Sequence, residues 1–265
     1  NLEKQYRSID LSKVKYLGID EFSIRKNHTY MTIFADLQTG RVLHAVEGTD
    51  KQAHSVFLKQ LSQKAKRLKA VAMDMSKSFI AAFKEYFPEI PIVFDRYHIM
   101  ALMNSKIDDL RRQQQRVLAE EGKSTLKGSR YLLLRNYHSL TEDHQVKLNV
   151  LLEANQPLST MHIMKEQLRS FWGQNSKERA ESFLRQWVFD ALMSGIKQLA
   201  SVGLTIFRNW NGILSYYPHK ITNGILEGLN NKIKTMKRQA YGFRDMEYFK
   251  LRIYDMHTSK YALSG

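Results

Sequence analysis

The sequence contains no cysteine and no run of apolar residues long enough to cross a membrane. Without cysteine the chain cannot form a disulfide framework, a thiolate zinc site or a thiol nucleophile, and this composition is compatible with a reducing cytoplasm. A transmembrane helix needs about twenty predominantly apolar residues, so we expect none here. Internal repeats and low-complexity tracts are also absent, which leaves a globular chain.

The first residues, Asn1-Leu2-Glu3-Lys4, lack both an initiating methionine and the charged-then-apolar pattern of a signal peptide. We therefore expect the sequence to be a piece of a longer protein. Its 265 residues suffice for one large domain or two modest ones. An apolar fraction of 43%, with 11% aromatic residues, can supply a sizeable core.

Acidic residues are few relative to basic ones. The chain has 26 Asp and Glu residues against 41 Lys and Arg, which gives a formal charge of +15 and a pI near 9.8. A positive field of this size attracts polyanions. Because the basic residues are spread through the chain, nucleic acid is the partner that fits best. On charge alone, the alternative is a soluble protein that happens to be basic.

The first hundred residues predict an α/β arrangement. Three apolar, β-branched and aromatic stretches are close enough in sequence to form an antiparallel meander: Val14–Ile24, Tyr30–Asp36 and Arg41–Glu47. Two further short apolar runs, Lys69–Met75 and Pro91–Phe94, suit buried strands, with a helix before each of them. The predicted order is therefore β-β-β-α-β-α-β.

The strand signals stop between His98 and about Tyr217. Leu, Ile and Met recur there at helical spacing and predict several helices, including Met100–Glu120, Glu142–Ala154, Met161–Trp172 and Lys177–Ala200. After Pro218, a final basic helix is predicted to begin near Thr222 or Asn223.

Two aspartates follow apolar strand sequence. Asp20 comes after Leu17–Ile19 inside its strand, and Asp74 ends the run that includes Val71–Met73. Burying a lone carboxylate is costly, and ligands collect at the carboxyl ends of parallel strands. Two such acids on neighbouring strands could converge on one ion such as magnesium or manganese. Taken singly, each aspartate could instead be a helix cap or a turn residue.

A third acid lies in the segment Ile221–Arg238. Four apolar residues recur there at helical spacing and predict one stripe: Ile225, Leu229, Ile233 and Met236. Four polar residues fall together on a different face: Glu227, Asn230, Lys234 and Arg238. A helix packed by its stripe would present Glu227 toward the strand ends, which suits polynucleotide cleavage. An ordinary charge pattern on a solvated helix is the alternative.

Five stretches of the chain share their amino-acid sequence and their order along the chain with one family. They are Gly18–Phe22 (GIDEF), Ala72–Ser76 (AMDMS), Phe94–His98 (FDRYH), Glu227–Lys234 (EGLNNKIK) and Lys237–Phe243 (KRQAYGF). Together they resemble the catalytic part of the ISL3-type insertion-sequence transposases, within the wider DDE class. The resemblance covers nearly the whole chain, and it is specific because all five stretches occur in order.

The resemblance implies a ribonuclease-H-like α/β fold. Its mixed sheet has three antiparallel strands followed by two parallel strands, is flanked by helices, and is interrupted by a large all-helical insertion. The implied domains are residues 1–97 for the first part of the catalytic core, 98–218 for the insertion, and 219–265 for the last part with the Glu-bearing helix. Asp20, Asp74 and Glu227 are then the catalytic residues and the ligands of two Mg²⁺ ions, with Mn²⁺ as a substitute.

The same resemblance implies cleavage and strand transfer of DNA for an insertion sequence. Its partners would be transposon ends and target DNA, with the protein acting as a homodimer or larger assembly in the bacterial cytoplasm at the nucleoid. Asp95 and His98 match an Asp-x-x-His signature and would support the site, either structurally or by contacting DNA. Candidate DNA contacts follow Glu227 on its helix: Asn230, Lys234, Lys237 and Arg238.

Full-length members of that family also carry a cysteine-rich zinc module and a helix-turn-helix region, and neither is visible here. Truncation best explains this departure, which puts recognition of transposon-end sequences by this piece in doubt. Two other functions stay open. One is a ribonuclease-H-like DNA nuclease without strand transfer. The other is a transposase-derived, non-enzymatic DNA-binding protein, against which the complete set of acids argues.

Overall fold

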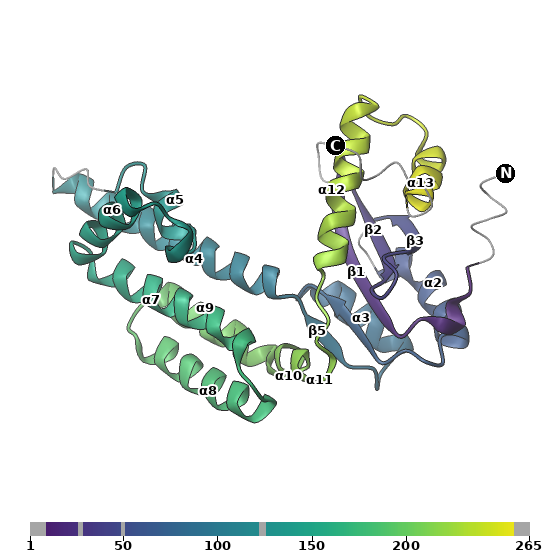
Figure 1. Ribbon diagram of the computed structural model, residues 1–265, viewed down its shortest axis with the longest axis horizontal. Coiled ribbons are helices and arrows are strands. Elements are labelled where there is room, and N and C mark those ends of the chain that lie inside the picture. Colours follow the sequence, from purple (N-terminus) through teal and green to yellow (C-terminus); the bar gives the residue numbers. More distant parts are fainter. Residues whose placement is uncertain (1–8, 26–28, 49–50, 122–125, 257–265) are drawn as a thin grey trace. The chain divides into compact units, whose positions relative to one another are not determined.

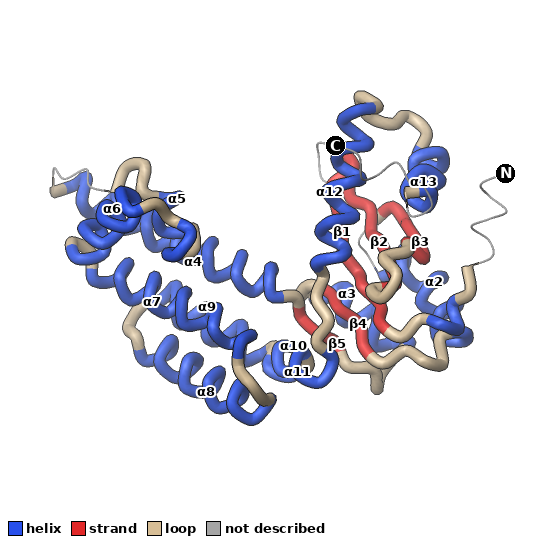
Figure 2. The backbone as a smooth tube through the Cα atoms, in the orientation of Figure 1, coloured by secondary structure: helices blue, strands red, loops and turns tan. Residues whose placement is uncertain are grey.

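The computed structural model describes residues 9–25, 29–48, 51–121 and 126–256. The chain divides into two compact units, one of residues 1–95 and 218–265 and the other of residues 96–217 (Figure 1). The first unit contains the sheet, and the described residues of the second form helices and no strand (Figure 2). The described residues include no helix that is long and apolar enough to cross a membrane.

The sheet of the first unit has five strands in the order β3-β2-β1-β4-β5. They are β1 (Tyr16–Arg25), β2 (Thr29–Asp36), β3 (Val42–Glu47), β4 (Ala70–Met73) and β5 (Ile92–Phe94). The first three are antiparallel, whereas β4 runs parallel to β1, and β5 runs parallel to β4. The predicted mixed sheet, with three antiparallel strands followed by two parallel ones, is therefore confirmed.

Two crossover helices, α2 (Lys51–Lys64) and α3 (Lys77–Tyr86), connect β3 to β4 and β4 to β5. Their aromatic side chains pack on one face of the sheet. The ring of Phe34 on β2 lies 4.9 Å from that of Phe57 on α2. The two helices shield this largely apolar face of the sheet from water. Parallel strands such as β4 are usually buried in this way.

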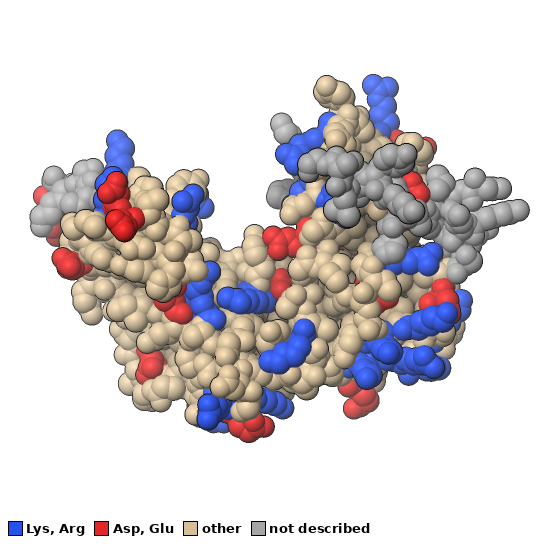
Figure 3. Space-filling model, viewed as in Figure 1, with Lys and Arg blue, Asp and Glu red and all other residues tan. Residues whose placement is uncertain are grey.

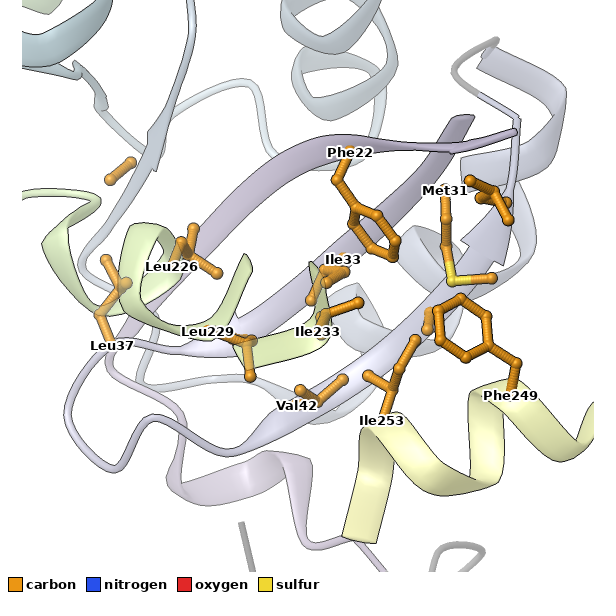
Figure 4. Packing of buried hydrophobic residues seen from close by; sticks show 14 residues of the cluster. Phe22, Met31, Ile33, Leu37, Val42, Leu226, Leu229, Ile233, Phe249 and Ile253 are labelled. Carbon is orange, nitrogen blue, oxygen red and sulfur yellow. The ribbon is translucent and has the colours of Figure 1, made fainter. Parts of the chain in front are cut away.

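The last part of the chain covers the opposite face of the sheet with α12 (Gly224–Gln239) and α13 (Met246–Asp255). Figure 4 shows side chains of these helices pointing toward the strands, where they form one buried cluster. Its members include Phe22, Met31, Ile33, Leu226, Leu229, Ile233, Phe249 and Ile253. The α13 helix was not predicted from the sequence.

The apolar stripe of α12 differs by one residue from the predicted one. Leu229 and Ile233 are buried and Met236 is partly buried, as predicted, but Ile225 is 42% exposed and Leu226 is fully buried in its place. The reason lies in β1. A Cβ atom at Gly18 would stand only 2.6 Å from Leu226 Cδ1, so the missing side chain leaves the space that Leu226 fills.

The described residues of the second unit are mainly helical. The helices are α4 (Arg96–Glu120), α5 (Arg130–Leu134), α6 (Glu142–Glu153), α7 (Gln156–Ser170), α8 (Lys177–Met193), α9 (Lys197–Arg208) and α10 (Trp210–Leu214). In sequence, α11 (Tyr216–His219) crosses the boundary between the units. The described residues also form three short 3₁₀ helices: η1 (Leu11–Lys13), η2 (Tyr137–Ser139) and η3 (Phe171–Gly173).

One predicted helix of this unit was wrong. The segment predicted as a single helix, Lys177–Ala200, forms α8 and α9, which pack against each other. Gly195 has a φ of 71°, which ends the first helix. The hydroxyl of Ser194 then accepts the backbone N–H of Ile196 at 3.1 Å. The apolar periodicity continues across this turn, so periodicity alone does not reveal the break.

A fully buried lysine ties two helices of the second unit together. Lys165 on α7 donates to the carbonyls of Leu133 and Arg135, at 2.8 and 2.7 Å, where α5 ends. It also pairs with Glu166 at 2.9 Å. Burial lowers the pKa of Lys165, whereas Glu166 raises it. A buried ammonium is tolerable only when it is bonded in this way.

The close approach at Gly18 gives a test of the α12 packing. We expect Gly18→Val to lower the free energy of unfolding by about 1–3 kcal/mol, because the added methyl groups overfill the space of Leu226. The matched control is Gly228→Ala on the exposed side of α12, where an added Cβ meets nothing within 4 Å. That change should raise the free energy by up to about 1 kcal/mol, because alanine favours helix. Urea unfolding measures both free energies. An unchanged free energy of unfolding for Gly18→Val would contradict this packing.

Candidate active site at the strand ends

The first candidate residue, Asp20, lies on the face of β1 that α12 covers. Side chains alternate along a strand, so Gly18, Asp20 and Phe22 point to the same face. Asn230 on α12 donates its side-chain Nδ2 to Asp20 Oδ2 at 2.7 Å. The backbone N–H of Glu21 donates to the other oxygen at 2.9 Å. This half-buried carboxylate is therefore held from its own strand and from the helix.

Asp74 follows the end of β4 at a position that is level with Asp20 in the register of the two strands. Gly18 on β1 is paired with Ala72 on β4, and each aspartate follows its paired residue by two positions. The Oδ1 atom of Asp74 accepts the backbone N–H of Ser76 at 2.8 Å, which forms a turn before α3. Asp74 thus has the turn role that single strand-end acids often have. It also has the neighbouring acid that the sequence predicted.

The first two turns of α12 run from the end of β5 to β1. At the helix start, the backbone N–H of Asn223 lies 3.5 Å from Oδ1 of Asp95, the residue that follows β5. Asn230, two turns later, bonds to Asp20 on β1. Glu227 lies between them, and the spacing of four and then three residues places all three on one side of the helix. Glu227 is exposed on this side of the helix, and β4, which leads to Asp74, lies between β1 and β5 in the sheet.

Several buried polar atoms at this end have no hydrogen-bond partner in the described part of the chain. They are Nδ2 and Oδ1 of Asn223, and Oδ1 of Asn230. Asn223 is 3% exposed and Asn230 is 7% exposed, so each unsatisfied atom destabilises the fold unless water or a ligand reaches it. Such atoms beside carboxylates fit a site that binds a hydrated ion.

Among the described residues, no three His, Asp or Glu side chains are close enough together to hold a metal ion. The backbone nevertheless brings Asp20 and Asp74 to adjacent positions, and Asn230 anchors the helix of Glu227 to Asp20. The roles of the three acids in metal binding and catalysis stay predictions. The sequence did not indicate the bond between Asn230 and Asp20, because their positions are 210 residues apart.

The other predicted residues fall in different places. Lys234, Lys237 and Arg238 line one open pocket of about 500 Å³, with Tyr241 and Gly242. Lys and Arg side chains also occur over the visible surface of both units (Figure 3). Asn230, a predicted DNA contact, instead lies buried against Asp20.

The predicted pair of Asp95 and His98 is divided between the units. Asp95 is 7% exposed and connects β5 to the start of α12. Its backbone N–H also donates to the carbonyl of Met73 on β4 at 3.2 Å. His98 lies in the first turn of α4, in the second unit, with its ring edge-on to Tyr97. A supporting role for His98 stays a prediction.

Comparison with known proteins gives consistent matches over most of the chain. A family model described as "Transposase", for the ISL3 type, matches residues 17–253. The transposase for insertion sequence element IS1001 of Bordetella parapertussis is 36% identical over 256 residues, which cover 95% of this chain and 63% of that protein. The transposase for element IS1557 of Mycobacterium tuberculosis is 26% identical over 257 residues, or 88% of this chain and 58% of that protein.

A third, shorter match is an ATP-dependent protease of Lactococcus lactis, which is 40% identical over 73 residues and covers only 26% of this chain. It is too short to indicate a family.

The two transposases are longer than this chain. The chain spans 63% of the length of the IS1001 transposase and 58% of the length of the IS1557 transposase.

The bond between Asn230 and Asp20 can be measured by a double-mutant cycle. We expect Asp20→Ala and Asn230→Ala to be coupled by about 1.5–3 kcal/mol in the free energy of unfolding, the range for a hydrogen bond to a charged group. Asp74→Ala with Asn230→Ala is the control pair and should be coupled by less than about 0.5 kcal/mol. A coupling near zero for the first pair would show that α12 is not anchored through Asp20.

Proposed function

The chain belongs to the ISL3 family of transposases, and on that premise we propose that Asp20, Asp74 and Glu227 are its catalytic residues. They would act in cutting DNA strands and joining them to new positions for an insertion sequence. The observation that carries this proposal is the course of α12, which passes from Asp95 to Asp20 with Glu227 between these two contacts.

The proposed fold assignment is a ribonuclease-H-like core with an all-helical insertion. The strand order β3-β2-β1-β4-β5 supports the first part of this assignment, because it places the acid-bearing strands β1 and β4 side by side. The second part is supported by the separate unit of residues 96–217, in which the described residues are helical. The proposed domains remain residues 1–97, 98–218 and 219–265.

The donor set fits hard divalent cations. We propose that Asp20, Asp74 and Glu227 hold two Mg²⁺ ions, with Mn²⁺ as a substitute, since carboxylate oxygens suit both. When bound, the ions would supply charge stabilisation at the reacting phosphate. Carboxylates that are brought together repel one another, and bound cations would offset that repulsion. The amide of Asn230, which orients Asp20, carries no charge of its own.

The remaining residues of the site would position DNA and the acids. The backbone N–H groups of Glu21 and Ser76 orient the two aspartates. We propose that Lys234, Lys237 and Arg238 bind DNA phosphates, because they line one open pocket on the helix of Glu227. Asp95 would hold the start of α12, and His98 would support the site or contact DNA.

On the same premise the partners are transposon ends and target DNA, bound by a homodimer or a larger assembly in the bacterial cytoplasm. Two other functions are outcomes of the tests below. A nuclease without strand transfer would cut DNA but form no joined product when target DNA is supplied. A non-enzymatic binder would bind DNA without metal-dependent cutting.

Conservative changes to the three acids test the proposed catalysis. Asp20→Asn, Asp74→Asn and Glu227→Gln should each reduce Mg²⁺-dependent cleavage and joining by at least about a thousandfold, or about 4 kcal/mol. Each keeps the shape of the side chain, so DNA affinity should change by less than about threefold. Gel assays of labelled DNA with and without target DNA measure the products.

The matched control is Glu89→Gln, an exposed acid between α3 and β5 that should leave cleavage unchanged. Cleavage at the normal rate by any of the three acid variants would end the assignment of that residue. Cutting without joining would identify the nuclease.

Salt dependence tests the proposed phosphate contacts. DNA affinity should fall steeply between about 50 and 200 mM salt, because each phosphate contact releases counterions. Lys234→Ala should reduce the slope of log K against log salt by about one. Lys59→Ala is the control, since this exposed lysine lies on α2, on the other face of the sheet. An unchanged slope for Lys234→Ala would exclude that residue as a contact.

A further inference from the structure

The turn that ends α12 holds a tyrosine where helices usually place glycine. The backbone N–H groups of Ala240, Tyr241 and Gly242 donate to carbonyls of the last turn, at 3.0, 3.1 and 2.9 Å. Tyr241 has a φ of 51°, in the left-handed region that favours glycine. The hydrogen bonds therefore fix the direction in which its side chain leaves the backbone.

In the described part of the chain, neither aromatic packing nor a hydrogen bond links the ring of Tyr241 to the fold. The residue is 102% exposed, and in the described part of the chain no aromatic ring packs against it and no hydrogen bond reaches its hydroxyl. A bulky side chain at positive φ is strained relative to glycine or asparagine. Packing therefore does not explain the tyrosine, whereas contact with another molecule would.

The surroundings of Tyr241 are basic and partly apolar. The open pocket of about 500 Å³ is lined by Tyr241, Gly242 and three cationic side chains, Lys234, Lys237 and Arg238, without an acidic one. A smaller pocket of about 180 Å³ shares Lys237 and Gly242 with it and is otherwise apolar, being lined by Ile24, Phe243, Met246 and Phe249. A ligand that combines negative charge with a flat apolar group fits this surface.

We infer that Tyr241 stacks on an unpaired base of a DNA strand whose phosphates contact Lys234, Lys237 and Arg238. Base faces are accessible only where a strand is single or a nucleotide is flipped out, and stacking on an aromatic ring tolerates any base. The cations beside the ring favour nucleic acid over a protein partner. This inference rests on the proposed function only in taking DNA as the ligand.

The position of Tyr241 on the helix sets the distance from the proposed chemistry. Glu227 lies in the first turn of α12 and Tyr241 follows the last turn. Glu227 and Tyr241 are therefore about 21 Å apart along the helix axis, at 1.5 Å per residue. A stacked strand that runs beside the helix covers this length with about six nucleotides, at 3.4 Å each. The unpaired base is therefore expected about six nucleotides from the reacting phosphate.

The test compares two DNAs with the chain of 265 residues. One is a fluorescein-labelled blunt duplex, and the other is the same duplex with a single-stranded tail of about six nucleotides. Binding is measured by anisotropy in EDTA, so that no cleavage intervenes. Tyr241→Ala should weaken binding of the tailed DNA about tenfold and of the blunt duplex less than twofold. Tyr241→Phe keeps the ring and should bind both DNAs as the parent chain does.

Two further variants separate stacking from structural effects. Tyr241→Asn removes the ring but tolerates positive φ, so it should weaken tailed-DNA binding as Tyr241→Ala does without lowering the thermal midpoint. Tyr131→Ala is the matched control, because Tyr131 is 68% exposed and has a guanidinium, that of Arg130, at 5.7 Å from its ring. It should bind both DNAs normally.

Equal binding of tailed DNA by Tyr241→Asn and the parent chain would overturn the inference. So would an equal loss on both DNAs, because it would place the tyrosine on the duplex. A parent chain without preference for the tailed DNA would overturn it as well. These outcomes concern binding without metal, whereas the proposed catalysis fails or stands on cleavage by the acid variants.

Discussion

Helix α12 lies close against β1 because the strand has no side chain at Gly18, and Leu226 occupies the space that a Cβ atom would take. This contact fixes the rotation of the helix. With Leu226 turned inward, Asn230 one turn later meets Asp20, and the neighbouring Glu227 is exposed. The rest of the proposed site depends on this packing, because Asp20 and Asp74 belong to the sheet whereas Glu227, Lys234 and Arg238 belong to the helix.

The charges along α12 are arranged in an order that suits both the helix and its proposed ligand. Its first turn carries Glu227, and its last turn carries Lys237 and Arg238. The helix dipole favours an anion at the start and cations at the end. The proposed cation binding at one end and the proposed phosphate binding at the other would therefore use charges that also stabilise the helix. The donors from Asn230, Glu21 and Ser76 to the two aspartates are neutral, so they fix these side chains without cancelling their charge.

Local patterns predicted the strands and their mixed directions, because alternation and short apolar runs depend on neighbouring residues. They also assigned Asp20 and Asp74 to two strands, which the structure shows to be adjacent, with Gly18 paired with Ala72. The phase of α12 was not predictable in this way. Ile225 and Leu226 are both apolar, and only the space at Gly18, far away in the sequence, decides which one is buried. The break at Gly195 was missed because apolar periodicity continues across it. Catalysis and metal binding by the three acids are not decided by the fold.

The contact of Asp20 with Asn230 spans 210 positions of the chain. A polypeptide leaves the ribosome from its N-terminal end, so the sheet residues with Asp20 and Asp74 emerge long before α12. The second unit must be synthesised in between. Such a long-range contact forms late in folding, because closing a large loop costs chain entropy before the contact stabilises the fold. An interrupted translation product that stops within the second unit would contain both aspartates but neither Glu227 nor the helix that anchors it. The order of the sequence thus keeps incomplete chains from assembling the full set of acids.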